Sequence, residues 1–237
     1  METVSLYFAA AIIVGVLFPI YALLYGGKTH QLLLEQPHKK VEVYRFTIIQ
    51  LILLAILATL PLMVDQLDPN TIGLGFIAKP LPVMGLFALS FLGLWLLNLV
   101  KITPQSAQKI SRQNSRVQFL MPTNAREYRT VITVSLVAGI CEEIIYRGFL
   151  LWFLSNYMPL VPAIILANLP FALAHLTSTG IKNTLGAFVL ALIFTGAFLL
   201  TKSLWLPILL HILIDLYAAT LSYKSSQALY ATEQPEE

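Results

Sequence analysis

The sequence predicts an all-α integral membrane protein, a polytopic bundle of seven or eight transmembrane helices. Of its 237 residues, 57% are hydrophobic and only 11% are charged, whereas soluble domains carry about 25% charged residues. A helix needs about 20 apolar residues to cross the hydrocarbon core of a bilayer. Apolar stretches of this order recur at residues 3–25, 46–64, 81–100, 130–154, 161–176, 184–200 and 204–223. An eighth helix would require a break in one of these stretches.

The connectors between these stretches differ in length and polarity. The first connector carries both basic and acidic residues and two histidines, from Lys28 to Arg45. Within the first apolar stretch, Gly15 and Pro19 predict a kink, because a proline inside a helix removes one backbone hydrogen bond. The sequence after Lys224 is polar and is expected to form a short tail.

Lysines and arginines predict the orientation of the bundle, because cytoplasmic connectors carry an excess of them. The first and third connectors hold the basic clusters, which places the N-terminus outside and the C-terminus in the cytoplasm. The third connector, residues 101–129, could form a surface helix near anionic headgroups, although a solvated loop is the favoured interpretation. It sets six cations against the single acid Glu127, namely Lys101, Lys109, Arg112, Arg116, Arg126 and Arg129.

The charge and cysteine content exclude some classes of partner and cross-link. The formal net charge of +3 is small and gives no nucleic-acid signature, and a chain this apolar needs membrane lipid around its surface. Cys141 is the only cysteine, which rules out an intrachain disulfide.

The segment 141–148 places three charges, on Glu142, Glu143 and Arg147, inside an apolar stretch. A charged group at the bilayer centre costs at least about 2.5–3.5 kcal/mol, and such groups usually face the bundle interior and mark function. Glu143 and Arg147 are four residues apart, so they can form a structural ion pair along one helix. Glu142 then points about 100° away and is free to face another group.

Three further ionisable residues lie inside the later apolar stretches: His175, and the pair His211 and Asp215. The spacing of four residues places His211 and Asp215 on one helix face. Imidazole is a common zinc ligand, and a catalytic zinc typically has three protein ligands and a water. A carboxylate beside that water can act as a general base. On spacing alone, a protease and a proton-coupled carrier are equally favoured, and each residue could instead serve helix packing.

Three motifs together favour the protease. Glu142-Glu143-x-x-x-Arg147, Phe171-x-x-x-His175 and His211-x-x-x-Asp215 occur in order, each in an apolar stretch. This set resembles the signature of the CPBP intramembrane metalloproteases, which include the CAAX prenyl endopeptidases and the Abi bacteriocin-immunity proteins. The resemblance covers about residues 130–220.

The resemblance implies roles for individual residues. It implies that Glu142 activates the catalytic water with help from His175, and that His211 and Asp215 bind metal or stabilise the oxyanion. A divalent metal, zinc, is the implied cofactor, with His175, His211 and Asp215 as its ligands. A metal-free mechanism based on glutamate and water is the alternative. Phe171 supports its motif, and Glu143 is counted both with the catalytic residues and in the ion pair with Arg147.

These expectations combine into one prediction. Residues 1–129 form a three-span region with a basic cytoplasmic loop, 130–223 a CPBP-like catalytic bundle of the last four helices, and 224–237 a polar tail. The predicted activity is cleavage of peptide bonds in a membrane-associated substrate, lipidated or not, at the bacterial plasma membrane. A proton-coupled carrier and a non-catalytic immunity or scaffold protein are the alternatives.

Overall fold

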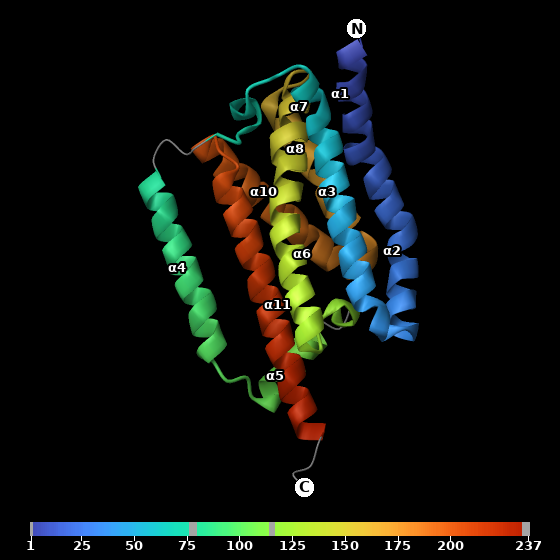
Figure 1. The fold of residues 1–237 in the computed structure, drawn as a ribbon, viewed down its shortest axis with the longest axis vertical. Helices are drawn as coiled ribbons and strands as arrows, with labels where there is room; N and C mark the ends of the chain where they lie inside the picture. The colour runs from blue at the N-terminus through green and yellow to red at the C-terminus, as the bar shows by residue number, and fades with distance from the viewer. Residues whose placement is uncertain (1, 76–79, 114–116, 234–237) are drawn as a thin grey trace.

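The computed structural model describes residues 2–75, 80–113 and 117–233 (Figure 1). Within these ranges the chain is helical apart from short connecting segments, and it contains no strand. The predicted all-α fold is therefore confirmed. The N-terminus and the C-terminus lie at opposite ends of the bundle.

The first apolar stretch forms one long helix with a wider turn inside it. It consists of α1 (Glu2–Ile12), the π-helical turn η1 (Ile13–Leu17) and α2 (Phe18–Glu35). The predicted kink at Gly15 and Pro19 corresponds to this π turn, because Pro19 has no backbone N–H to bond the carbonyl one turn earlier. The helix continues to Glu35, through much of the expected connector.

A short 3₁₀ turn, η2 (Pro37–Lys39), leads into α3 (Lys40–Val64), and η3 (Pro69–Ile72) follows it. Next come α4 (Pro80–Leu99), α5 (Pro104–Gln113) and η4 (Gln118–Leu120). The favoured loop in the third connector was therefore wrong for residues 104–113, which form the surface helix that was the alternative. Ala107 of α5 is fully buried and Lys109 and Arg112 are exposed.

The segment with the three motifs folds into the remaining helices. A continuous helix is built from α6 (Ala125–Glu143), the π turn η5 (Ile144–Leu150) and α7 (Leu151–Ser155). It is followed by α8 (Leu160–Ala174), α9 (Leu176–Thr179), α10 (Ile181–Thr201) and α11 (Trp205–Glu233). Because α11 continues to Glu233, most of the expected C-terminal tail is helical.

Four helical segments are long and apolar enough to cross a membrane: Val4–Glu35, Pro37–Val64, Ile181–Thr201 and Trp205–Thr232. Met84–Leu99 and Leu160–Ala174 are shorter apolar helices. The helix formed by residues 125–155 is also long, but it is not one of these four, because it contains the three charged residues of the Glu142–Arg147 motif. The protein is an integral membrane protein, and the number of seven or eight spans stays a prediction.

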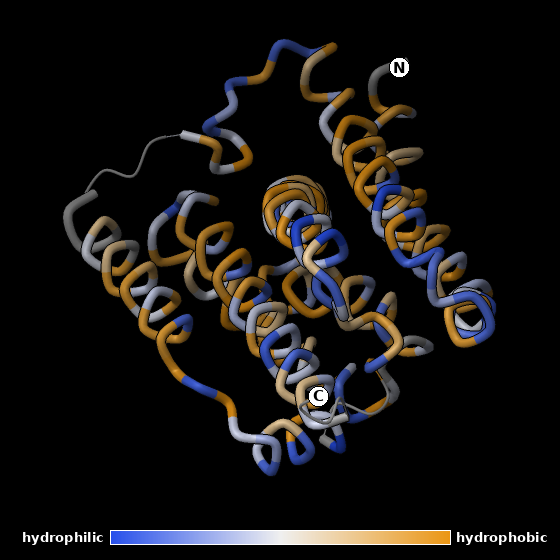
Figure 2. The backbone as a smooth tube through the Cα atoms, turned by 60° about the horizontal axis from the view of Figure 1, so that its bottom comes forward, coloured by the Kyte–Doolittle hydropathy of each residue, from blue (hydrophilic) through white to orange (hydrophobic). Residues whose placement is uncertain are grey.

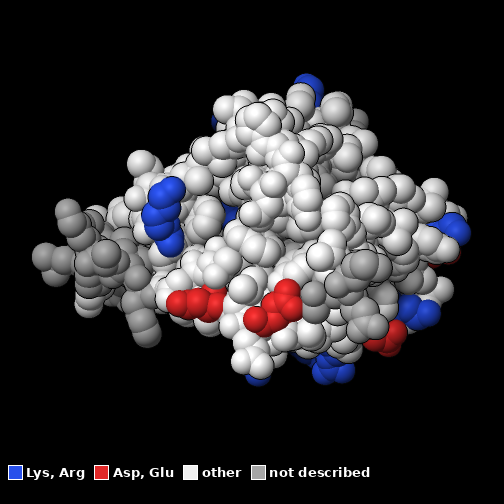
Figure 3. All heavy atoms as spheres, turned by 90° about the horizontal axis from the view of Figure 1, so that it is seen from above, with Lys and Arg blue, Asp and Glu red and all other residues white. Residues whose placement is uncertain are grey.

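The distribution of polarity agrees with a membrane bundle. The helices are mostly hydrophobic along their length, and hydrophilic residues concentrate in the segments that join them (Figure 2). The end of the bundle that carries the N-terminus shows few charged side chains (Figure 3). The basic first and third connectors lie toward the opposite end of the bundle, and α5 of the third connector packs beside α11.

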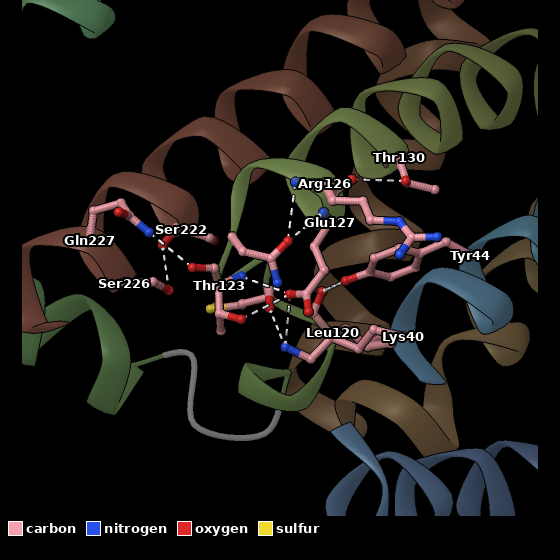
Figure 4. A network of polar contacts seen from close by, with 12 residues as sticks. Lys40, Tyr44, Leu120, Thr123, Arg126, Glu127, Thr130, Ser222, Ser226 and Gln227 are labelled. Atoms are coloured by element: carbon pink, nitrogen blue, oxygen red, sulfur yellow. Dashed lines mark hydrogen bonds and ion pairs between the residues drawn. The ribbon is translucent and has the colours of Figure 1, made fainter. Parts of the chain in front are cut away.

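A buried ion pair fastens the chain at this basic end (Figure 4). Lys40 Nζ, at the start of α3, donates to Glu127 Oε2 over 3.2 Å and to the Met121 carbonyl over 2.9 Å. The backbone N–H and the hydroxyl of Thr123 also donate to Glu127 Oε2, over 2.8 and 3.0 Å. Burial alone would raise the pKa of Glu127, but the Thr123 hydrogen bonds and the Lys40 charge outweigh it and lower this pKa below its usual value.

The hydrophobic core lies between the N-terminal helices and the motif-bearing helices. Its buried members come from α1 and η1, α3, α6 with η5 and α7, α8 and α10, for example Val14, Ala58, Phe149, Ala163 and Ala191. The core is thus shared across the predicted boundary at residue 129.

Candidate functional site

The π turn η5 carries the first motif into the interior. Glu143 is the last residue of α6 and Arg147 lies within η5, and both side chains are fully buried. Arg147 Nη1 donates to Glu143 Oε1 over 2.8 Å, so the ion pair expected from their spacing is present. A π turn inserts one residue per turn and often marks a functional site.

Two aromatic rings cover the guanidinium of Arg147. Its central carbon lies 4.8 Å from the ring centre of Phe171 on α8 and 5.5 Å from that of Phe194 on α10. Cation–π contacts of this kind are worth about 2 kcal/mol when they are desolvated. The buried charge is therefore held by one carboxylate and two rings, from three different helices.

His211 joins the first and third motifs. Its Nδ1 lies 2.8 Å from Glu143 Oε1. A carboxylate paired with Arg147 only accepts hydrogen bonds, so the proton of this bond belongs to Nδ1. The ring is thereby oriented with Nε2 toward two other carboxylates, 3.7 Å from Glu142 Oε2 and 3.8 Å from Asp215 Oδ2. Phe194 stacks on the same imidazole at 5.2 Å between ring centres.

His175 is the cap residue at which α8 ends and α9 begins. Its Nδ1 donates to the Phe171 carbonyl over 2.8 Å, because a carbonyl oxygen can only accept, and this bond orients the ring. The Phe171 ring centre lies 5.0 Å from that of His175 and 5.9 Å from that of His211. The Phe171 ring therefore lies between the two imidazoles, and the second motif lies beside the third.

Exposure divides the charged side chains of the site into two groups. The side chains of Glu143 and Arg147 are fully buried and that of His211 is 7% exposed, whereas those of Glu142 and Asp215 are 16% and 37% exposed. Glu142 and Asp215 are therefore accessible from outside the bundle, while Glu143 and Arg147 lie behind His211. The adjacent glutamates of the motif occupy different environments, as the 100° rotation between neighbouring helix positions requires.

The predicted metal site can be compared with these positions. Within the part of the chain that the structure describes, no three His, Cys, Asp or Glu side chains are arranged to hold one metal ion. The predicted ligands His175, His211 and Asp215 lie in one region, but they do not surround a common point as they stand. The divalent metal stays a prediction.

Three features of the site had no signal in the sequence motifs. The bond between Glu143 and His211 depends on how α6 packs against α11, which spacing within one helix does not report. Phe194 lies on α10, which carries no motif. Beside it, Thr195 exchanges hydrogen bonds of 2.9 and 3.1 Å with Asn168 of α8, a buried polar pair that could have been suspected only from two polar residues in apolar stretches.

The comparisons with known proteins agree with the three motifs. Residues 125–217 match the family model described as type II CAAX prenyl endopeptidase Rce1-like. Comparison with curated proteins and with solved structures gave no match. The matched range begins at the start of α6, includes every residue of the site and ends within α11. The resemblance to the CPBP proteases is confirmed by this match, and residues 125–217 of this chain are similar to the Rce1-like type II CAAX prenyl endopeptidases.

Proposed function

We propose that this protein is an intramembrane endopeptidase that uses Glu142 to activate water against a peptide bond of a membrane-associated substrate. The family implies a protease of the CAAX type. The observation that supports Glu142 is its partial exposure, 3.7 Å from the Nε2 atom of an imidazole that Glu143 holds in place. A separation of this size is one that a water molecule can bridge.

In the proposed reaction, Glu142 accepts a proton from the water while the oxygen of that water forms a bond to the scissile carbonyl carbon. The carbonyl electron pair moves to the carbonyl oxygen and forms a tetrahedral oxyanion. When the pair returns, the carbon–nitrogen bond breaks, and Glu142 gives its proton to the departing amine. The products are a carboxylic acid and an amine, so one water is consumed for each bond cleaved.

The two histidines support this proton transfer in different ways. The family resemblance implies that His175 helps Glu142 to activate the attacking water, and the bond from its Nδ1 to the Phe171 carbonyl holds the ring in place. His211, with Nδ1 fixed by Glu143, stabilises the oxyanion when Nε2 is protonated. Asp215, beside the same Nε2, favours that protonated form through its charge.

The proposed substrate follows from the family resemblance and from the position of the site inside a membrane-embedded bundle. A membrane-associated protein or peptide, lipidated or not, fits a site inside an apolar bundle. Orientation with the N-terminus outside and the basic end in the cytoplasm follows from the lysines and arginines at that end. Cleavage would then take place from the bilayer, at the plasma membrane of a bacterium.

Peptide cleavage by the reconstituted protein tests the proposal. Glu142→Gln and His211→Gln are compared with Glu42→Gln, which removes an exposed carboxylate at the start of α3, far along the chain from the motifs. Loss of a general base lowers the rate about 10²–10⁴-fold, so Glu142→Gln is expected to be nearly inactive and Glu42→Gln unaffected. Full activity of Glu142→Gln would contradict the proposal. Solute flux without any cleaved peptide would instead favour the proton-coupled carrier.

The predicted zinc needs its own measurement. If His175, His211 and Asp215 bind a divalent metal, the purified wild-type protein should contain about one equivalent. His211→Gln should then lose most of that metal. Equal metal content in both proteins would contradict a ligand role for His211.

A further inference from the structure

The site depends on how closely α6 approaches α11. Glu142 and Glu143 belong to α6, and His211 and Asp215 belong to α11, and the two helices lie side by side (Figure 1). A hydrogen bond of 2.8 Å between Glu143 Oε1 and His211 Nδ1 spans the contact. Such a bond is lost when the two atoms separate by much more than about half an ångström, so the distance between the helices must be set by something rigid.

Gly139 lies at the centre of this contact. It is four residues before Glu143 and three residues before Glu142, so on the helix surface it lies between the directions of the two glutamates. A Cβ atom at Gly139 would lie 2.5 Å from Ile212 Cγ1, 3.0 Å from the Ile212 backbone nitrogen and 3.4 Å from the Ile208 carbonyl oxygen. Two of these three neighbours are backbone atoms, which cannot turn away as the end of a long side chain can.

The atoms that crowd Gly139 belong to the helical turn that carries His211. Ile212 follows His211 directly, and Ile208 precedes it by three residues. A side chain at position 139 would therefore push back the part of α11 that bears the imidazole. The same displacement would carry Nδ1 away from Glu143 and change the distance from Nε2 to Glu142.

We propose that Gly139 is a positioning residue that sets the separation of α6 and α11 and thereby holds His211 against the two glutamates. This inference rests on the proposed function for its effect on cleavage, although the bond between Glu143 and His211 can be observed without it. Gly139 itself touches no reacting atom, because it is buried in the helix contact.

Gly139→Ala tests the proposal, with Gly186→Ala as its matched control. Gly186 is also a helical glycine, on α10, and a Cβ atom there would meet no described atom within 4 Å. A misplacement of about 1 Å in an active site can cost about 10²-fold in rate. We expect Gly139→Ala to lower kcat by about that factor with little change in KM, and Gly186→Ala to match the wild type.

A second measurement follows His211 directly. In lipid-reconstituted protein labelled with ¹⁵N-histidine, the Nδ1 signal of His211 is assigned by its loss in His211→Gln. Gly139→Ala should move this signal toward that of an imidazole without a carboxylate partner, and Gly186→Ala should leave it in place. An unchanged signal together with unchanged kcat in Gly139→Ala would overturn the proposal.

A double variant separates crowding from general damage. Gly139→Ala/Ile212→Ala removes the closest of the three neighbours but keeps both backbone contacts, so it should recover part of the signal shift and part of kcat. If the single variant does not accumulate while the double variant does, the same crowding acts on folding. Failure of the wild type to cleave any peptide would count against the proposed function alone, since the His211 signal would still test Gly139.

Discussion

At the scale of single residues, two adjacent glutamates have taken different roles. Glu143 is fully buried between two cationic or proton-donating partners, and Glu142 is partly exposed beside His211. Sequence spacing was enough to pair Glu143 with Arg147 and to turn Glu142 away from them. It could not show that Glu143 also binds His211, because a bond between residues 68 positions apart depends on tertiary packing.

The different surroundings of the two glutamates predict different effects on stability. Glu143→Gln leaves Arg147 as a buried charge without its carboxylate, and breaking a buried pair in this way costs about 3–5 kcal/mol. Glu142→Gln exchanges a partly exposed group and should unfold close to the wild-type temperature. Thermal unfolding in detergent compares them. Equal melting temperatures for the two variants would show that the Glu143–Arg147 pair contributes no stability.

Phe194 offers a second prediction at this scale. Its ring stacks on His211 and covers Arg147, so Phe194→Leu keeps an apolar side chain but loses both ring contacts. We expect slower cleavage and a lower melting temperature, because aromatic and cation–π contacts contribute about 0.5–2 kcal/mol each. Ile193→Leu, at an exposed position of the same helix, should change neither quantity. Wild-type cleavage and melting temperature in Phe194→Leu would show that the ring does not contribute to the site.

At the scale of helices, hydrophobicity predicted the elements better than their ends. The segments expected at residues 46–64 and 81–100 correspond closely to α3 and α4. The helices α2 and α11 extend well past their apolar stretches, to Glu35 and Glu233, because a helix can continue into the polar layer where hydropathy no longer reports it. The helix α5 was only the less favoured interpretation of its connector, because its inner face, with Ala107 buried and Ile110 partly buried, is too small to stand out in hydropathy.

The start of α6 carries a prediction about pH. The folded state lowers the pKa of Glu127, so the stability from this carboxylate is fully present above its unfolded pKa of about 4.3. That stability is lost as the pH falls through the lower, folded value. The melting temperature of the wild type should therefore fall in acid more steeply than that of Glu127→Gln. Parallel curves from pH 7 to pH 3 would show that the Lys40–Glu127 pair does not contribute.

At the scale of the whole molecule, the family segment is not a separate folding unit. Residues 125–217 match the family, but the hydrophobic core also contains Tyr7, Val14, Leu51 and Ala58 from the N-terminal helices. Hydrogen bonds cross the same boundary, from Lys40 to Glu127 and from Thr177 of α9 to the Ala22 carbonyl. No composition break in the sequence could have revealed this shared packing.

The shared core predicts the behaviour of fragments. A chain of residues 125–237 alone should be degraded or aggregate in the membrane, because it exposes the surface that α1 to α3 cover. Coexpression of residues 1–124 should restore a protease-resistant complex, measured by limited proteolysis and copurification. Stable accumulation of the fragment by itself would show that the N-terminal helices are dispensable for folding.

A single oxygen atom of Glu143 links the contributions of Arg147 and His211. Glu143 Oε1 accepts one hydrogen bond from Arg147 and another from His211. A change in either partner can therefore alter the bond of the other without direct contact between them. Their contributions are therefore thermodynamically coupled through a single acceptor. In a double-mutant cycle of Arg147→Met and His211→Gln, the two free-energy changes should not add, since contacting networks show interaction energies of about 0.5–3 kcal/mol. Selection that acts on the imidazole of His211 must then act on the arginine as well, although its side chain is fully buried.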